Sequence, residues 1–454
     1  MMVIWSFKAV AFVKQSKKAR KPQIKDAQVE IHALSHEAHG VSRSQEKVMF
    51  VPGALPGETV KVRIEKEMRH FNHGKILEII TPSPERVSPP CPHYQRCGAC
   101  QLQHLQSDKQ LGYKQSNLHE QLKRQLKLDT VPWQAPITSE DLGYRRRARL
   151  GVRYRNKLDE IIVGFREEAN SHLTSIGSCP VLQPSLSNLI EPLQSLISLL
   201  QAKSRVTQLE LIASDEKDVV VLRHLKKIGQ EDQAIIKDWA SSHNAQFYLQ
   251  GDEAEDFQCL WPNADTAANV SLNYSVLGNT LDFNVKNFIQ GNRKVNIAMV
   301  TQALEWLDGK PDESLLDLFA GIGNFSIPAA KHFKKVLAVE GISSMVTQIN
   351  HNAQLNNLSN VQAQVMNLND DILLERLPKA DAVLLDPPRT GAAELMPWLS
   401  KLSSRILYVA CEPSSLVRDA RVLLDAGFKL EKIATMDMFP QTKHVETMAL
   451  FTKK

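Results

Sequence analysis

Cys411 and Glu446 carry the most distinctive chemistry in this sequence. Cys411 lies in Ala-Cys-Glu-Pro, and Glu446 ends the segment Phe-Pro-Gln-Thr-Lys-His-Val-Glu. A thiol nucleophile and a carboxylate base are what methylation at C5 of a pyrimidine requires, because that carbon is not nucleophilic by itself. Thiolate attack at C6 makes C5 enolate-like, and a base must remove the C5 proton after methylation. We therefore take Cys411 as a candidate nucleophile and Glu446 as a candidate base; the alternative for Cys411 is a buried core thiol.

A second motif predicts a nucleotide-like cofactor. In Asp317-Leu-Phe-Ala-Gly-Ile-Gly-Asn-Phe-Ser, Gly321 and Gly323 let the backbone turn tightly and approach a ligand closely. Ser326 stands where a pyrophosphate-binding motif has its third glycine, and Glu340 ends the next predicted strand, where a carboxylate accepts hydrogen bonds from ribose hydroxyls. A ligand with adenosine but no pyrophosphate indicates S-adenosylmethionine. The alternative is an ordinary turn followed by a surface glutamate.

The segment Asp386-Pro-Pro-Arg389 follows another predicted strand. Carboxyl ends of parallel strands are where ligands bind, and the two prolines stiffen the loop that directs the Asp386 carboxylate toward the pocket. A related Asp-Pro-Pro-aromatic pattern serves enzymes that methylate exocyclic amines, whereas Arg389 replaces the aromatic here. An amine methyltransferase is therefore a rival interpretation, but such an enzyme would not need Cys411.

Cys91-x5-Cys97-x2-Cys100 and the later Cys179 supply four thiols. The close spacing of the first three is hard to explain by core packing. Four thiolates suit either tetrahedral zinc or an iron–sulfur cluster, and spacing alone does not decide between them. Cys259 lies beside Leu260 and Trp261 and is expected to be a core residue.

The segment 143–157 has seven Lys and Arg residues and no acid, with Tyr144 and Tyr154 among them. Cations pair with phosphates and rings stack on bases, so this composition favours a nucleic-acid surface; the alternative is a solvated strand face. The candidate RNA contacts are Arg145, Arg146, Arg147, Arg149, Arg153 and Arg155.

Helices and strands alternate from about residue 286 onward. This pattern predicts a parallel sheet covered by helices, with an antiparallel pair at the end. The predicted helix is 292–308, and the strands are 315–320, 335–340, 361–366, 382–386, 405–410, 428–436 and 445–452. Upstream, 27–81 predicts a small β-barrel, 81–90 is a proline-rich linker, 105–128 is helical, and strands are expected near 147–154, 161–166, 206–213 and 218–224.

Bulk composition is that of a multidomain globular protein. The chain has 454 residues, of which 43% are apolar and 23% charged, and its net charge of +5 decides nothing. No apolar run reaches membrane-spanning length, so no membrane association is expected. With six cysteines and no export signal, a cytoplasmic protein is expected. Residues 1–26 form a basic N-terminal arm, and no obligate protein partner is evident.

Together, these residues resemble the RNA (uracil-5)-methyltransferase family, in particular its 23S ribosomal RNA branch. The resemblance runs from about residue 25 to the C-terminus, and 27–81, with HGVSR and FVPGALPGETVKVRI, is similar to a TRAM domain, a small OB-like RNA-binding barrel. It implies a class I, Rossmann-like methyltransferase domain at 286–454 and a mixed α/β central iron–sulfur domain with RNA contacts at 91–285.

The resemblance also implies roles for individual residues. Cys411 would be the nucleophile and Glu446 the base, and Cys91, Cys97, Cys100 and Cys179 would hold a [4Fe-4S] cluster. The S-adenosylmethionine site would be lined by Gln290, Phe319, Asn324, Glu340, Asn367 and Asp386. At two positions the chain departs from the family pattern: Glu412 replaces an Asn after the thiol, and Gln441 replaces a common His.

The expected activity is S-adenosylmethionine-dependent formation of 5-methyluridine in 23S ribosomal RNA, which is the expected partner. A transfer-RNA enzyme is the nearest rival, disfavoured because those relatives look to lack both the TRAM domain and the cysteine cluster. A non-catalytic RNA-binding protein is a further alternative, and the intact set of Cys411, Glu446 and Asp386 argues against it.

Overall fold

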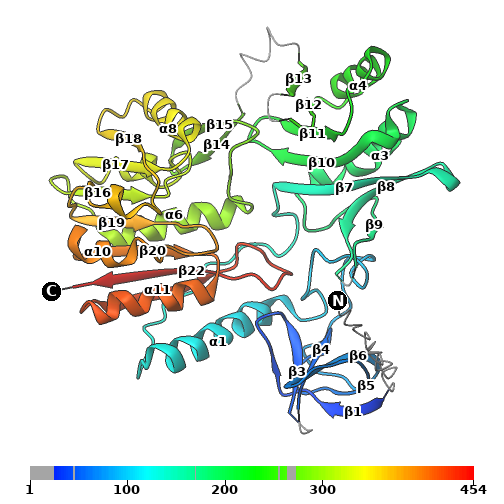
Figure 1. Ribbon diagram of the computed structural model, residues 1–454, viewed down its shortest axis with the longest axis horizontal. Coiled ribbons are helices and arrows are strands. Elements are labelled where there is room, and N and C mark those ends of the chain that lie inside the picture. The colour runs from blue at the N-terminus through cyan, green and yellow to red at the C-terminus, as the bar shows by residue number, and fades with distance from the viewer. Residues whose placement is uncertain (1–24, 44–46, 169, 254–255, 263–271, 454) are drawn as a thin grey trace, which may run out of the picture. The chain divides into compact units, whose positions relative to one another are not determined.

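The computed structural model describes residues 25–43, 47–168, 170–253, 256–262 and 272–453 (Figure 1). The chain divides into two compact units, one of residues 25–33 and 39–82, the other of 34–38 and 83–453. Nearly all of the predicted basic arm at 1–26 lies outside the described residues. No described helix is both long and apolar enough to span a bilayer.

The first unit is built on a six-stranded sheet in the order β1-β5-β6-β4-β3-β2. Its strands are β1 (Asp26–Glu30), β2 (Ala33–Leu34), β3 (His39–Ser42), β4 (Val48–Pro52), β5 (Thr59–Glu67) and β6 (Phe71–Thr81). Apolar and polar residues alternate along β5, so that Val60 and Val62 are fully buried against Val29 and Val51. The short strands predicted for this region are confirmed.

A seven-stranded sheet, β13-β12-β11-β10-β7-β8-β9, begins the second unit. Its strands are β7 (Arg147–Arg155), β8 (Glu160–Arg166), β9 (Leu173–Ser175), β10 (Val206–Ala213), β11 (Asp218–His224), β12 (Gln246–Gln250) and β13 (Phe257–Trp261). The helices here are α1 (Ser107–Leu126), α2 (Pro184–Ser187), α3 (Ile190–Leu199) and α4 (Gln230–Ser242), with 3-10 turns at Asn156–Leu158 and Lys203–Arg205. The four strands and the helix predicted in this part are confirmed.

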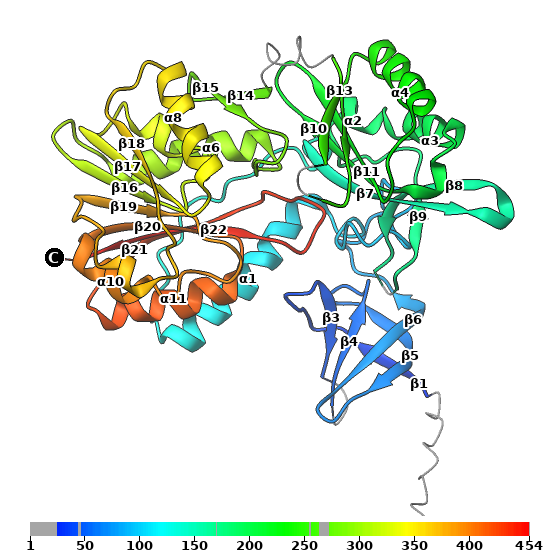
Figure 2. The same cartoon turned by 45° about the horizontal axis from the view of Figure 1, so that its top comes forward.

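A second seven-stranded sheet has the order β18-β17-β16-β19-β20-β22-β21 (Figure 2). Its strands are β16 (Ser314–Leu318), β17 (Lys335–Glu340), β18 (Val361–Val365), β19 (Ala382–Leu385), β20 (Arg405–Ala410), β21 (Lys429–Met436) and β22 (Glu446–Thr452). The helices are α6 (Arg293–Leu307), α7 (Ser326–Ala329), α8 (Ser343–Leu355), α9 (Asp371–Leu374), α10 (Met396–Leu402) and α11 (Pro413–Asp425). The first five strands are parallel and β22 is antiparallel to β20 and β21, as the sequence predicts.

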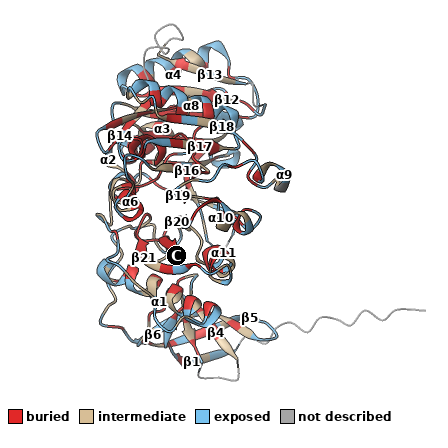
Figure 3. Cartoon of the chain, turned by 90° about the vertical axis from the view of Figure 1, so that its left-hand side faces the viewer, coloured by how far each residue is buried: buried red, intermediate tan, exposed pale blue. Residues whose placement is uncertain are grey.

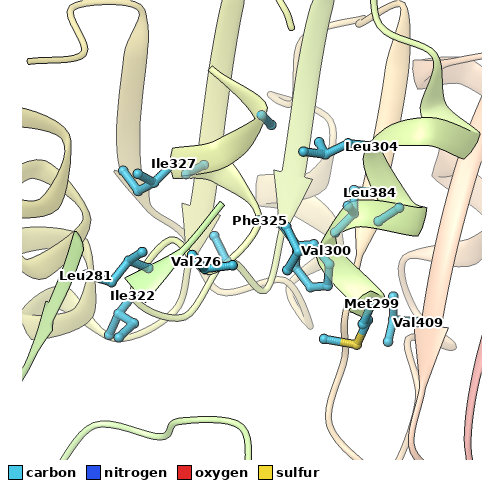
Figure 4. Close-up of a cluster of buried hydrophobic side chains, with 14 of the residues drawn as sticks. Val276, Leu281, Met299, Val300, Leu304, Ile322, Phe325, Ile327, Leu384 and Val409 are labelled. Atoms are coloured by element: carbon cyan, nitrogen blue, oxygen red, sulfur yellow. The ribbon is translucent and has the colours of Figure 1, made fainter. Parts of the chain in front are cut away.

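Helices cover both faces of this sheet, so its central strands are buried on both sides (Figure 3). The hairpin β14 (Leu272–Val276) and β15 (Asn279–Phe283) packs with the same part of the chain, its Val276 and Leu281 lying near Ile322 (Figure 4). The boundary predicted between residues 285 and 286 therefore separates the hairpin from the core that it joins.

Helix α1 lies beside α11, at the far end of the chain (Figures 1 and 2). Its apolar residues Leu118, Leu122 and Leu126 are buried in the same hydrophobic cluster as Leu416 of α11. The helix that follows the cysteine-rich segment thus belongs to the packing of the C-terminal sheet.

Candidate active site

The strand order reverses beside β16, which pairs with β17 on one side and β19 on the other. In an open α/β sheet, ligands bind at the carboxyl ends of the strands next to such a reversal. The residues that follow these ends are Phe319 after β16 and Asp386 after β19, while Glu340 is the last residue of β17. The topology therefore brings the predicted cofactor residues to one edge.

The loop after β16 has the backbone conformation that its glycines permit. Gly321 and Gly323 have φ angles of +59° and +92°, and Phe319 also has a positive φ, +63°. The Gly321 amide donates a hydrogen bond to Glu340 Oε2 at 3.0 Å, and the Ile342 amide donates to Oε1 of the same carboxylate at 3.1 Å. Glu340 thus holds the glycine loop against the end of β17.

Gln290 and Asp386 meet although they are far apart in sequence. Gln290 is 7% exposed, and its Nε2 donates to Asp386 Oδ2 at 3.4 Å. The Asn324 side chain is turned to other residues: it exchanges two hydrogen bonds with Asn296, at 2.8 and 2.9 Å. Asn367 is exposed, and its Oδ1 accepts from the Asn369 amide at 3.1 Å. That these residues contact a cofactor stays a prediction.

Sheet register brings the thiol and the predicted base together. Strand β20 ends at Ala410, which pairs with Thr447 of the antiparallel strand β22. Cys411 therefore follows the end of β20 where Glu446 begins β22. The carboxylate is 6% exposed and the thiol is partly exposed. This is the arrangement that the sequence predicts from two separate motifs.

Burial and neighbouring charges set the protonation of this group. Burial raises the pKa of Glu446 to about 7, and the Arg389 guanidinium opposes that rise. Burial, then the charges of Glu446 and Asp386, raise the pKa of Cys411 to about 11, again opposed by Arg389. Burial and Glu446 hold the pKa of Asp386 well above its usual range. Burial and neighbouring acids thus disfavour negative charge here, whereas the Arg389 guanidinium favours it at both Cys411 and Glu446.

Arg389 and His444 are site residues to which the sequence analysis assigns no role. Both line the cavity that contains Cys411 and also a neighbouring groove. Burial, followed by the charges of Arg389 and other cations, lowers the pKa of His444 to about 4, so this imidazole is neutral at pH 7. A cation directly after the rigid Asp-Pro-Pro segment was the available signal for Arg389.

Glu412 caps helix α11. Its carboxylate accepts hydrogen bonds from the Ser414 amide at 3.5 Å and the Ser414 hydroxyl at 3.1 Å. An Asn, the residue usual in the family pattern, is also a good N-cap. The charges that raise the pKa of Cys411 are those of Glu446 and Asp386. The substitution therefore keeps the capping function and leaves the carboxylate occupied by the helix.

A groove that shares Arg389 and His444 with the Cys411 cavity is basic and aromatic. It has a volume of about 590 Å³, and its lining includes Arg145, Arg147, Arg149, Lys286, Phe288, Arg389, Phe439 and His444. The Arg145 guanidinium lies over the Phe439 ring, 5.6 Å from its centre. We call this surface the basic groove.

The predicted RNA-contacting arginines divide into two groups. Arg149, Arg153 and Arg155 are exposed on one face of β7, as the alternation predicts. Arg147 is 14% exposed and donates to Glu210 Oε1 at 2.7 Å. The prediction is wrong for Arg146, which is 2% exposed and faces the interior. The alternation that exposes every second arginine buries the one out of phase with it.

The four cysteines of the predicted cluster come near one another. Burial raises the pKa of Cys97 to about 11 and of Cys100 to about 12, and in both cases neighbouring cysteines, Cys91 and Cys179 among them, add to the rise. In the described part of the chain, no group of three or more His, Cys, Asp and Glu side chains is arranged to hold a metal ion. The structure thus gathers the thiols without forming a closed metal site.

Two models of known protein families match the chain. The family model described as tRNA (uracil-5-)-methyltransferase matches residues 106–454, which is most of the chain. The chain belongs to this family. A TRAM domain model matches residues 25–77, against the predicted bounds 27–81.

Family relatives match nearly the whole chain. A protein from Vibrio cholerae serotype O1, named 23S rRNA (uracil(1939)-C(5))-methyltransferase RlmD, is 40% identical over 97% of this chain and 99% of its own length. A protein of the same name from Shewanella sediminis is 41% identical over 93% of this chain and 95% of its own length. The similarity therefore includes both units.

A solved structure shares the fold. The tRNA (uracil-54, C5)-methyltransferase of Pyrococcus abyssi, determined in complex with S-adenosyl-L-homocysteine, aligns with a TM-score of 0.73 and 22% identity. The alignment covers 94% of this chain and all of that chain. The mixed α/β fold with a methyltransferase sheet is therefore shared with a family member of low sequence identity.

Proposed function

We propose that this protein transfers a methyl group from S-adenosylmethionine to C5 of a specific uridine in 23S ribosomal RNA, in the cytoplasm. The observation that carries the proposal is the juxtaposition of Cys411, Glu446 and Arg389 at the carboxyl edge of the sheet. The substrate is supported by the names of relatives about 40% identical over nearly the whole chain. An amine methyltransferase would leave the thiol and the carboxylate without a role.

The chemistry follows from the residue types. Cys411 loses its thiol proton to solvent, and the thiolate attacks C6 of the uracil: a C6–S bond forms, and the C5–C6 electron pair moves toward C5 and O4. S-adenosylmethionine, when bound, supplies a methyl group on a sulfonium to that activated carbon. Glu446 then removes the C5 proton, the double bond re-forms, and the C6–S bond breaks to release the Cys411 thiolate.

Two features near Cys411 oppose the burial that disfavours its thiolate. A pKa near 11 keeps the thiol protonated in the free protein, and Arg389 is the neighbouring charge that favours the thiolate. Helix α11 begins at Pro413, two residues later, so its N-terminal dipole also favours negative charge. With a pKa of about 7, Glu446 is a substantially ionised base at neutral pH.

For the cofactor, the proposed contacts are Gln290, Phe319, Gly321, Gly323, Asn324, Glu340, Asn367 and Asp386. Support comes from the positive φ angles of the glycine loop and from the acidic groups at this edge. Burial raises the pKa of Asp317 to about 7, and the charges of Asp386 and Glu340 add to it. A cationic ligand would relieve this accumulation of acids, which fits a sulfonium compound.

We further propose that Cys91, Cys97, Cys100 and Cys179 hold a [4Fe-4S] cluster. The residues fit such a group in donor chemistry, because burial and the charges of neighbouring cysteines raise the pKa of the Cys97, Cys100 and Cys179 thiols, and a cationic iron core would remove that penalty. Four thiolate ligands leave no open position for substrate, so the cluster would be structural. Iron and acid-labile sulfide assays of anaerobically purified protein test this: about four of each per chain are expected, and zinc instead would contradict it.

Trapping with 5-fluorouridine transcripts tests the reaction. A 23S RNA fragment and a transfer RNA, each containing 5-fluorouridine, are incubated with the protein and S-adenosylmethionine and run on a denaturing gel. Fluorine cannot leave as a proton, so the covalent complex stalls after methyl transfer. A shifted band with the 23S fragment, absent for Cys411→Ala, is the expected result.

The other outcomes separate the alternatives. A band only with transfer RNA would reassign the substrate within the same family. No band with either RNA would contradict uridine methylation and would favour an amine methyltransferase or a non-catalytic RNA-binding protein instead. Glu446→Gln offers a matched control: lacking the base, it should accumulate the same complex with ordinary uridine, while Cys411→Ala should not.

A further inference from the structure

Arg146 is buried although its neighbours in the arginine-rich segment reach the surface. It is 2% exposed, whereas Arg149 and Arg153 on β7 are exposed. Burying a guanidinium is costly unless its hydrogen bonds and charge are compensated. The groups that compensate it therefore indicate what Arg146 does.

One set of contacts fixes the segment that contains Gln290. Arg146 Nε donates to the Gln290 carbonyl at 2.8 Å, and the Arg146 amide donates to the Gly291 carbonyl at 3.0 Å. Gln290 in turn donates its side-chain amide to Asp386. Arg146 therefore fixes the backbone at Gln290 and Gly291, from which the Gln290 side chain extends to the proposed cofactor site.

A second contact reaches the glycine loop. The Arg146 guanidinium lies over the Tyr274 ring, 4.5 Å from its centre. The Tyr274 hydroxyl donates to Asn324 Oδ1 at 3.0 Å, and Asn324 directly follows Gly323 in that loop. One buried side chain thus touches Gln290 directly and Asn324 through an aromatic ring.

The charge of Arg146 is only weakly balanced. Burial lowers its pKa, while Tyr274 and Asp215 act in the opposite direction. In the described part of the chain, its Nη2 atom has no hydrogen-bond partner. A residue kept for stability alone is more simply apolar at such a position, because buried charges are often replaceable by apolar side chains without loss.

We infer that Arg146 is a positioning residue for S-adenosylmethionine, which holds Gln290 and, through Tyr274 and Asn324, the glycine loop in the geometry that binds the cofactor. The inference rests on the proposed function, since it takes the cofactor site to be the one described above. It also removes Arg146 from the RNA-contacting residues. Lysine cannot replace it, because an ammonium does not combine a directed Nε–H bond with planar stacking on a ring.

Cofactor affinity without RNA tests this. Binding of S-adenosylhomocysteine to the full chain is measured by calorimetry for wild type, Arg146→Lys, Tyr274→Phe and the control Arg149→Gln. Arg146→Lys should weaken binding about tenfold, the equivalent of one buried charge-assisted hydrogen bond. Tyr274→Phe keeps the ring but loses the bond to Asn324, and should weaken binding about threefold. Arg149→Gln should bind the cofactor product as wild type does.

RNA affinity provides the second readout. Filter binding with a 23S fragment should give wild-type affinity for Arg146→Lys and weaker binding for Arg149→Gln. A purely structural defect in Arg146→Lys would instead weaken its binding of both the cofactor product and the RNA. The inference would be overturned if Arg146→Lys bound S-adenosylhomocysteine with wild-type affinity. If the lysine variant does not fold, the same result for Tyr274→Phe would overturn it. The two proposals fail in different experiments: RNA trapping tests methylation, and cofactor binding without RNA tests Arg146.

Discussion

Three ionisable side chains occupy the carboxyl edge of the sheet: Cys411, Glu446 and Asp386. Burial raises the pKa of all three, and neighbouring negative charges raise the pKa of Cys411 and Asp386 further. Glu446 is affected mainly by burial, because it begins a strand whose residues are almost all buried. The same desolvation that gives it a pKa suited to a base at neutral pH costs folding free energy. Activity and stability should therefore respond oppositely to its replacement.

Glu446→Gln should be more stable than wild type at high pH. The native state binds the Glu446 proton more tightly than the unfolded state, with a pKa of about 7 against the ordinary 4.5. Wild type therefore loses stability as pH rises from about 4.5 to about 7, by roughly 3 kcal/mol at most. Denaturant unfolding near pH 5 and near pH 8 (about those values) should show the difference growing with pH. An equal difference at both would contradict the buried, ionising carboxylate.

Arg389→Gln should shift the pH dependence of the reaction to higher pH. Arg389 lowers the pKa of both Cys411 and Glu446, so its loss makes both the thiolate and the ionised base scarcer at neutral pH. The rate of covalent trapping at saturating RNA should reach its half-maximum about one pH unit higher. Arg389→Lys, which keeps the charge, should shift less. An unchanged pH profile would mean that Arg389 does not control the ionisation of Cys411 and Glu446.

At the scale of elements, the segment between β21 and β22 is held by parts of the chain more than 300 residues away. Gln441 and Gln110 of α1 exchange two hydrogen bonds of 2.9 Å, and both are buried. The Gln101 and Leu102 amides, just after Cys100, both donate to the Gln441 carbonyl at 3.0 Å. The loop that leads to Glu446 is therefore fastened to the cysteine-rich segment and to α1.

Gln441→Ala and Gln110→Ala should each destabilise the protein by about 2 kcal/mol, because each leaves buried hydrogen-bonding groups unpaired. The double variant should cost less than the sum of the two, since both single changes break the bond from Gln110 Nε2 to Gln441 Oε1. Denaturant titration of all four proteins gives the coupling energy. Ser116→Ala is a suitable control, because its exposed hydroxyl bonds only the helix turn of Gly112. Additive effects would mean that the two glutamines act independently.

At the scale of the whole second unit, the basic groove and the exposed face of β7 form adjoining surfaces. A neighbouring cavity shares Arg149 and Phe165 with the basic groove and also includes Arg153. Exposed arginines beside an aromatic-lined groove are suited to an RNA strand that leads to a base at Cys411. Under the proposed function, this unit would carry the cofactor-binding, catalytic and RNA-facing residues together.

The double variant Arg149→Gln, Arg153→Gln should bind a 23S fragment less tightly and with a weaker salt dependence. Removing a cation that pairs with a phosphate reduces the slope of log affinity against log salt by about 1. Filter binding over a salt series measures this slope. Cofactor binding should stay at the wild-type level, because both side chains are exposed on β7. An unchanged slope would remove these arginines from the RNA interface.

Much of the fold and the site could be predicted because the signals were local. Glycines after a strand, an acid at the end of the next, and a thiol at the end of a third need only the rule that parallel strands share a carboxyl edge. Cys411 and Glu446 come together for a different reason: their strands are antiparallel neighbours, so the end of β20 lies beside the start of β22. The alternation of helices and strands was therefore sufficient to predict the sheet, while the motifs at its strand ends gave the site residues, whose roles stay a prediction.

Other parts depended on partners that no local pattern reveals. Arg146 and Arg149 are the same residue type in one short segment, but the first meets Tyr274 and Gln290 and the second meets solvent. In the sequence, Gln441 was only a departure from the family pattern; its hydrogen bonds to Gln110 depend on the tertiary structure. The chain by itself determined which chemistry was present and at which strand ends, since these follow from residue type and periodicity. Only tertiary packing decided which charges were buried and which faced solvent, because burial depends on segments distant in sequence.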